Sequence, residues 1–174
     1  MNDRKSEHDD EESEHSDESE PVAKADREVA KRLRVKGVVV AGASRSFVAS
    51  PGAVWEALLA IPEWPNWYRS IKDLEVASGE IEVGSRFSFR TGPATIKAEV
   101  ESAEPGESFR FTGRSAGSIT TYAFEIEGRG GGCRVLAAQS MGGLATRAMK
   151  PVLQGVAEKS VVTWLDALAV HLGE

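Results

Sequence analysis

The chain has 174 residues, of which 41% are hydrophobic and 28% charged, and its formal net charge is −6. This length fits one domain with a short extension, and the composition excludes a collagen-like chain and a wholly disordered one. A single cysteine, Cys133, excludes an intrachain disulfide framework and a multi-cysteine zinc site. No apolar run approaches the roughly 20 residues of a membrane-spanning helix.

The first twenty residues differ in composition from the rest of the chain. They hold ten acids and two bases, and no apolar side chain follows Met1. Such a segment cannot bury enough apolar surface to offset its chain entropy, so it is expected to be a disordered acidic tail. A basic stretch follows at 21–36, with a composition that tolerates a frayed helix. We therefore divide the chain into a tail and basic linker at 1–33 and a folded domain at 34–174.

The tail has several readings that the residues leave open. Its serines could be phosphorylated, and His8 and His15 could chelate a metal, although a solvating role is the ordinary one for such a segment. A protein partner could also bind through the tail. We expect no nucleic-acid partner, because the linker's net charge of +4 adjoins the tail's net charge of −8. The N-terminus lacks the basic start and apolar stretch of a signal peptide, which predicts a cytoplasmic protein without stable membrane insertion.

Apolar patterning predicts the elements of the domain in chain order. A β-branched run at 38–48 predicts the first strand, and Ser50-Pro51 predicts the start of a helix at 51–60. Two prolines confine any helix at 61–68 to a turn or two. From residue 70 the period changes to two, and short turns make consecutive strands antiparallel neighbours. Six further strands are expected at 72–78, 84–91, 94–103, 108–114, 118–126 and 133–141.

Alternation within these strands gives the sheet one apolar and one polar face. The apolar face is expected to hold Phe87, Phe89, Ile96, Ala98, Val100, Phe109, Phe111, Tyr122, Phe124, Ile126, Val135, Ala137, Gln139 and Met141. The polar face mixes charges of both signs, which favours pairing across strands over binding of a polyanion. A helix at 144–172 should cover the apolar face, with a kink or restart at Pro151. Its stripe is expected to run through Leu144, Ala148, Val152, Val156, Ser160, Trp164, Leu168 and Leu172.

These elements predict an α+β fold in which a curved antiparallel seven-stranded sheet wraps around a long C-terminal helix, with two short helices after the first strand. Several segments of the sequence also match a known pattern. They are Ser50-Pro51 through Leu58, Ile61 through Trp67, Val83-Gly84-Ser85-Arg86-Phe87, Phe111-Thr112-Gly113-Arg114, Tyr122-Ala123-Phe124-Glu125, and Arg134-Val135 followed by Ser140-Met141-Gly142-Gly143. On these segments, about residues 36–172 resemble polyketide cyclase/dehydrase-like proteins of the START-like, helix-grip superfamily, also called SRPBCC.

The resemblance implies a helix-grip fold with a hydrophobic-ligand cavity between sheet and helix. Members of the superfamily bind lipids, sterols, polyketides, plant hormones or coenzyme Q, and some cyclise or dehydrate polyketides. The matched positions are mostly structural, so the resemblance carries over no catalytic residue to this chain.

Three glycine-containing motifs point to ordinary structure. The G-x-S-x-G pattern at 113–117 precedes β-forming residues and has no nearby histidine base, so it predicts a hairpin turn and not a nucleophile elbow. The segment 38–44 lacks the later glycines of a dinucleotide-binding turn. Gly130-Gly131-Gly132 lies between two strands and predicts a flexible hairpin loop, and no nearby group would activate Cys133.

The predicted function is binding, as a carrier or sensor, of a small hydrophobic or amphipathic molecule. Tyr122 and Gln139 are the polar groups of an otherwise apolar face, and Trp64, Trp67 and Tyr68 are candidates for an aromatic rim, although simple core packing is the alternative for each. The predicted ligand-binding residues are Trp64, Trp67, Phe87, Phe89, Phe109, Phe111, Tyr122, Phe124, Gln139, Met141 and Trp164. The alternative is a polyketide cyclase or dehydratase acting in the same cavity, which the lack of a core histidine and of an inward acid disfavours. We predict no catalytic residue, no cofactor and no metal site.

Overall fold

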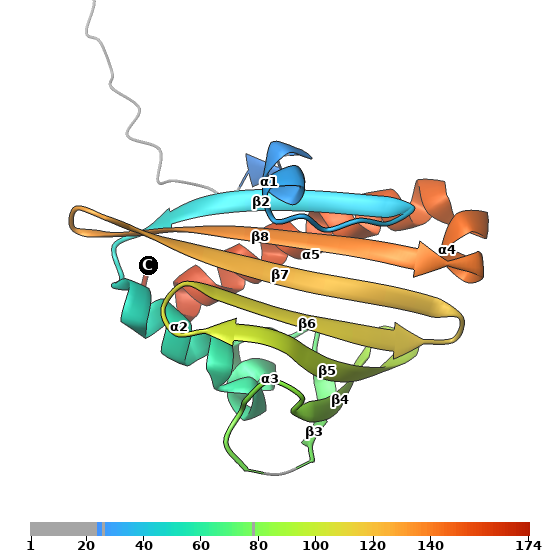
Figure 1. Cartoon of the computed structure of the whole chain (residues 1–174), viewed down its shortest axis with the longest axis horizontal. Helices are drawn as coiled ribbons and strands as arrows, with labels where there is room; N and C mark the ends of the chain where they lie inside the picture. Colours follow the sequence, from blue (N-terminus) through green and yellow to red (C-terminus); the bar gives the residue numbers. More distant parts are fainter. Residues whose placement is uncertain (1–23, 26, 78) are drawn as a thin grey trace, which may run out of the picture.

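The computed structural model describes residues 24–25, 27–77 and 79–174 and shows a sheet that curves around one long helix (Figure 1). The disorder and the protein partner expected for the acidic tail concern residues outside this part of the chain. The elements are β1 (Lys24–Ala25), α1 (Arg27–Arg32), β2 (Val39–Phe47), α2 (Pro51–Leu59), the 3₁₀ helix η1 (Ile61–Glu63), α3 (Trp64–Trp67), β3 (Lys72–Val76), β4 (Arg86–Thr91), β5 (Ala94–Glu104), β6 (Ser108–Ser115), β7 (Ser118–Arg129), β8 (Gly132–Gly143), α4 (Leu144–Ala148) and α5 (Lys150–His171).

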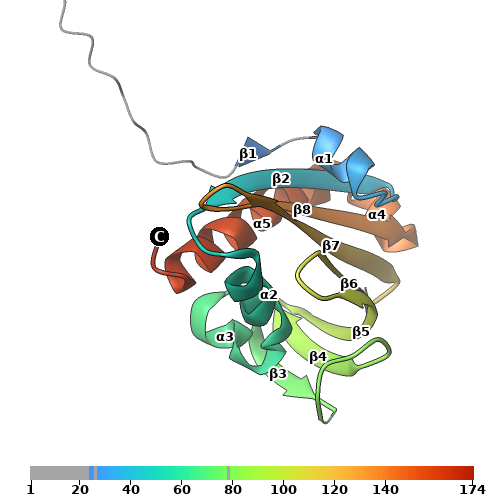
Figure 2. The same cartoon turned by 60° about the vertical axis from the view of Figure 1, so that its left-hand side comes forward.

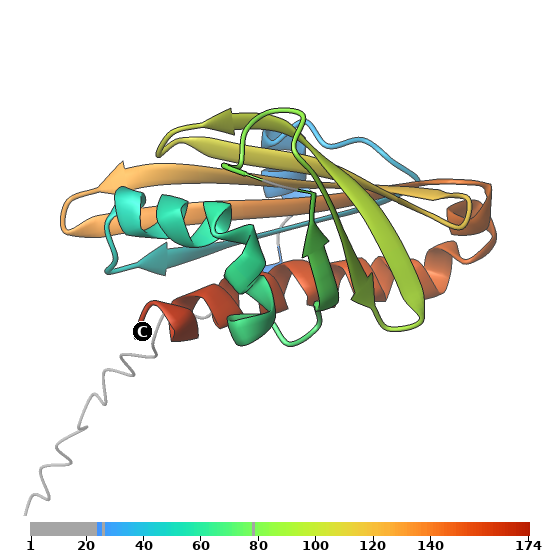
Figure 3. The same ribbon diagram turned by 90° about the horizontal axis from the view of Figure 1, so that it is seen from below.

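The sheet has the spatial order β1-β2-β8-β7-β6-β5-β4-β3, and every neighbouring pair is antiparallel. Strands β2 to β8 form the predicted seven-stranded curved sheet, and the two-residue β1 extends its edge. Strand β2 pairs with β8, so the first long strand lies beside the last one. Helix α5, which follows β8 through α4, runs back across the concave side of the sheet (Figures 2 and 3). The predicted α+β helix-grip fold is therefore confirmed.

The register of the strands places the predicted apolar face on the concave side of the sheet. Tyr122 pairs with Phe111 on one side and with Gln139 on the other, so the three side chains lie in one row. The predicted residues of this face are buried, apart from Met141, which is half-buried. A slip of one residue would turn the intervening charged side chains inward, so the alternation specifies this register.

The predicted start of α2 at Ser50-Pro51 is confirmed. The Ser50 hydroxyl accepts a hydrogen bond from the Ala53 N–H at 3.2 Å, which satisfies one of the free donors at the helix N-terminus. The prolines that follow divide the next segment into η1 and α3, as expected of residues that cannot donate within a helix. These short helices cover one end of the concave face.

The C-terminal helix restarts at Met149 ahead of Pro151, as the sequence indicated, but the predicted stripe is only half correct. Trp164 and Leu168 are buried as predicted, together with Ala157, Val161, Leu165 and Ala169. By contrast Leu144, Ala148, Val152 and Val156 are exposed, and Ser160 and Leu172 are half-buried. The reason is that α5 is packed along the sheet mainly through its second half, so helical periodicity in the first half does not coincide with burial.

The convex face is not wholly polar, because α1 packs on it. Val29, Ala30, Leu33 and Val35 form a second small apolar cluster with Ala123, Leu136 and Ala138 of β7 and β8. The Arg32 guanidinium also pairs with the carboxylates of Glu125 and Glu127. The folded unit therefore includes α1, which lies before the boundary at residue 34 drawn from the sequence. Among the described residues, no helix is both long and apolar enough to cross a membrane.

Candidate functional site

The space between the sheet and α5 is built around two tryptophans. Trp64, from α3, is fully buried, and its ring lies 5.0 Å from that of Trp164 on α5, 5.4 Å from Phe111 and 5.6 Å from Phe87, between ring centroids. Its indole N–H donates to the Leu58 carbonyl at 3.1 Å, which fixes the ring orientation. The side chain therefore lies at the centre of the aromatic cluster and not at a rim, contrary to the role suggested for it from its position beside prolines.

Trp164 connects this cluster to the residues at the end of α3. Its ring lies 4.3 Å from Tyr68, 5.4 Å from Trp67 and 5.4 Å from Phe124. Trp67 is half-buried and stacks on the exposed His171 ring at 5.4 Å. Trp67 is thus the member of the cluster that reaches from the aromatic interior to the surface.

Polar atoms in this interior are few, and two of them lack a partner. The Oε1 atom of Gln139 and the Nε1 atom of Trp67 are buried without a hydrogen-bond partner. Leaving such groups unpaired away from water costs free energy, so each needs a reason. One is an acceptor and the other a donor, so a complementary polar group on a bound molecule would satisfy either one.

The two buried phenols lie in the same interior. Burial raises the pKa of Tyr122, and the neighbouring Tyr68 adds a smaller increase. Burial also raises the pKa of Tyr68, against smaller lowering effects of hydrogen bonds with Ser160 and Ser70. Both hydroxyls therefore stay protonated at neutral pH and can donate a hydrogen bond. Tyr68 was a candidate for the aromatic rim because it follows Trp67, but it was not among the predicted ligand-binding residues.

The predicted ligand-binding residues converge on one region of the fold. Nine are buried on the concave face or facing it, while Trp67 and Met141 are half-buried. They come from α3, β4, β6, β7, β8 and α5, and aromatic side chains in mutual contact fill much of the space between them. A ligand between sheet and helix therefore requires some of these side chains to change rotamer.

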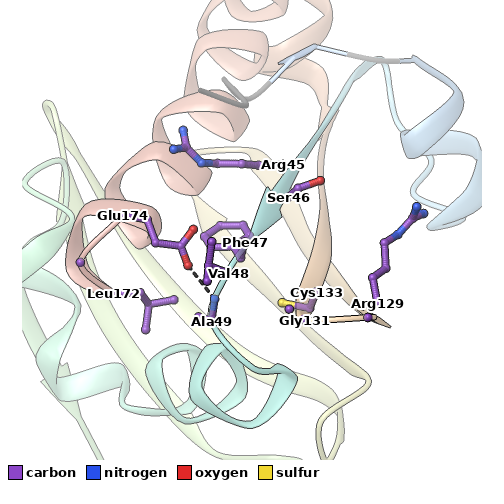
Figure 4. A pocket seen from close by; sticks show the side chains of 13 residues that line it. Arg45, Ser46, Phe47, Val48, Ala49, Arg129, Gly131, Cys133, Leu172 and Glu174 are labelled. Atoms are coloured by element: carbon purple, nitrogen blue, oxygen red, sulfur yellow. Dashed lines mark hydrogen bonds between the residues drawn. The ribbon is translucent and has the colours of Figure 1, made fainter. Parts of the chain in front are cut away.

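A separate depression of about 820 Å³ lies at the C-terminal end of β2, where the β7–β8 hairpin meets the C-terminal residues of the chain (Figure 4). Arg45 lines it and pairs with Asp166 of α5 at 2.7 Å, while its Nε atom is buried without a partner. The Glu174 carboxylate accepts a hydrogen bond from the Ala49 N–H at 2.7 Å. Burial, and then the Glu174 charge, raises the pKa of Cys133, so its thiol stays protonated and weakly nucleophilic. None of the predicted ligand-binding residues lines this depression.

Comparison with known proteins places the chain in a family. The sequence pattern described as "Polyketide cyclase / dehydrase and lipid transport" matches residues 38–173, which is most of the chain. The chain belongs to this family. No curated protein sequence matches it.

Solved structures show the same fold at low identity. A START superfamily protein from Mycobacterium smegmatis is similar with a TM-score of 0.65 and 12% identity, over 76% of this chain and 95% of that one. The hypothetical protein jhp0584 from Helicobacter pylori gives 0.63 and 20%, over 76% and 86%. DynU16, a putative protein in the dynemicin biosynthetic locus, gives 0.56 and 18%, over 76% and 46%. The polyketide cyclase/dehydrase family and the START-like fold point to hydrophobic molecules as the class of ligand.

Proposed function

We propose that this family member binds a small, uncharged hydrophobic or amphipathic molecule between the concave face of the sheet and α5, as a carrier or sensor. The observation that carries the proposal is the unpaired acceptor of Gln139, enclosed among aromatic and aliphatic side chains. A ligand hydroxyl or amide N–H would satisfy it, and the row of Phe111, Tyr122 and Gln139 would orient that group.

The charge state of the ligand follows from its surroundings. Among the described residues, the buried polar side chains besides the tyrosines are Thr120, Gln139, Ser140 and Thr146, and no Asp, Glu, His, Lys or Arg side chain is buried. A carboxylate or ammonium group placed here would lose its hydration without gaining a counter-charge. The proposal therefore favours neutral groups such as a hydroxyl, a ketone or an amide.

The enzymatic alternative has less support. Among the described residues, the titratable groups of the main core are the phenols of Tyr68 and Tyr122 and the thiol of Cys133, whose raised pKa values keep them protonated at neutral pH. A protonated phenol can donate a hydrogen bond to a carbonyl, but it cannot take a proton from carbon as a cyclase or dehydratase requires. Binding without chemistry is thus the function that these groups fit best.

Native mass spectrometry of the purified full-length chain tests the proposal directly. A co-purifying neutral molecule is expected, and adding candidate lipids, sterols or aromatic polyketides should raise the melting temperature. Because Trp64, Trp67 and Trp164 surround the site, their fluorescence should change on binding. No bound molecule, together with no thermal or fluorescence response across such a panel, would overturn the proposal. A cytoplasmic location stays a prediction, which imaging of the tagged protein can test.

A further inference from the structure

The first half of the C-terminal helical segment exposes a group of aliphatic side chains. Leu144 of α4 is 81% exposed, and Met149, Val152 and Val156 follow with 53%, 63% and 53%. The last three are spaced by three and four residues, so they lie on one side of the helix. Isolated exposed aliphatic residues are ordinary, but a contiguous set indicates a contact surface.

Basic side chains surround these residues. Lys36 and Arg147 line one surface depression together with Leu144, and the exposed Lys150 begins α5. Arg114 lies next to the β6–β7 turn, which is held against α4 by a 3.1 Å hydrogen bond between Ser118 and Thr146. Figure 1 shows α4, the start of β2 and the β6–β7 turn at the same end of the molecule. We name this set of four aliphatic and four basic residues the α4 patch.

The charge of the α4 patch contrasts with that of the whole chain. No Asp or Glu occurs at 34–44, 109–124 or 128–157, the three segments from which the patch is built. In the part of the chain that the structure describes, none of its four bases forms an ion pair. A protein with a net charge of −6 thus concentrates unpaired positive charge around exposed aliphatic side chains.

We propose that the α4 patch docks the protein on the surface of an anionic lipid bilayer. Aliphatic residues interspersed with Lys and Arg on an exposed helix match the acyl and phosphate layers of a bilayer. A second copy fits less well, since a two-fold contact would bring the four bases of each copy together. A nucleic acid would pair its phosphates with the basic side chains but would leave the aliphatic side chains in water. The docking is peripheral and does not depend on the ligand proposed above.

Vesicle sedimentation of the full-length protein tests this docking. The probes are phosphatidylcholine vesicles with and without about a third of phosphatidylserine. Binding is expected to the anionic vesicles only, and to weaken as salt is raised, because the Debye length shortens. We expect both Leu144→Asp/Val152→Asp and Arg147→Glu/Lys150→Glu to reduce the partition coefficient at least tenfold. All four positions are exposed, so the variants should fold, which circular dichroism checks.

Val170→Asp is the matched control, because Val170 is an exposed aliphatic residue near the opposite end of α5, with 74% exposure. It should bind the anionic vesicles like the unmodified protein. No binding to anionic vesicles would overturn the proposal, as would an equal loss in the control. Loss only in the Arg147→Glu/Lys150→Glu variant would indicate a general anion-binding surface and also contradict it. A dimer in solution that dissociates in the Leu144→Asp/Val152→Asp variant would assign the patch to a second copy instead.

Discussion

Replacing Gln139 with leucine should stabilise the protein and weaken its binding of ligand. The Gln139 side chain is 4% exposed, and its Oε1 atom has no partner. An unsatisfied buried acceptor costs about 1–3 kcal/mol, and leucine has a similar size without it. The free energy of unfolding should therefore rise by about 1–3 kcal/mol, which for a domain of this size corresponds to roughly 2–4 °C per kcal/mol in melting temperature.

The same substitution removes the acceptor proposed for the ligand. A ligand donor left unpaired should cost about 1–3 kcal/mol of binding, or roughly a 5- to 150-fold increase in Kd. Urea unfolding and calorimetric titration of the ligand found by mass spectrometry measure the two effects. A residue that only supports the fold would not show opposite changes in stability and affinity.

Gln154→Leu is the matched control for Gln139→Leu. The Gln154 amide donates to the Val40 carbonyl at 2.9 Å and to the Glu158 carboxylate at 2.8 Å. Losing these bonds should lower stability by about 1–2 kcal/mol. If Gln139→Leu destabilises the protein as Gln154→Leu does, the unpaired-acceptor argument is refuted. If stability rises but ligand affinity is unchanged, Gln139 is not the ligand anchor.

Four further substitutions test the packing and the ion pairs of the fold. Trp164→Ala should lower the free energy of unfolding by about 3–5 kcal/mol, measured in urea, because the buried ring contacts the rest of the aromatic cluster; a loss below 1 kcal/mol would contradict that role. Gly132→Ala should cost about 1–3 kcal/mol because its Cβ would overlap a backbone oxygen of β2, while Gly130→Ala, with open space around it, should change stability by less than about 0.5 kcal/mol. Burial raises the pKa of Glu127, but hydrogen bonds from Arg32 and Arg129 outweigh it, so the pKa is lowered overall. The contribution of Glu127 to stability is therefore present above its unfolded-state pKa and is lost as the pH falls through the lowered, folded-state pKa. The stability difference between the unmodified protein and Arg32→Ala should accordingly shrink on acidification, and a difference independent of pH would count against this pairing.

The sequence predicts the sheet well because burial there follows a strict period of two. Phe87, Phe111 and Phe124 could be assigned to one face from alternation alone, since a neighbouring charged residue excludes the other register. The turns between strands were equally clear from their glycines and prolines.

The helices were less predictable, because helical periodicity indicates a stripe but not what covers it. The same spacing joins Val152 to Trp164, yet one is exposed and the other buried. Burial of α1 depends on Val29 and Leu33 meeting an apolar patch of the convex face, which no local pattern in 27–35 reveals. The central position of Trp64 depends likewise on tertiary contacts, those of its ring with Phe87, Phe111 and Trp164.

Two departures from local sequence rules bear on the two proposals, one on β8 and the other on α4 and α5. Gln139 leaves an acceptor unpaired where leucine would fit, and Leu144 and Val152 expose aliphatic surface where polar residues would be more soluble. Each choice has a cost in the isolated protein, and such costs concentrate at functional sites. The neutral ligand proposed above would explain the first, and the proposed docking on an anionic bilayer would explain the second. Because the two explanations rest on different residues and different assays, the Gln139→Leu result and the vesicle result can fail separately.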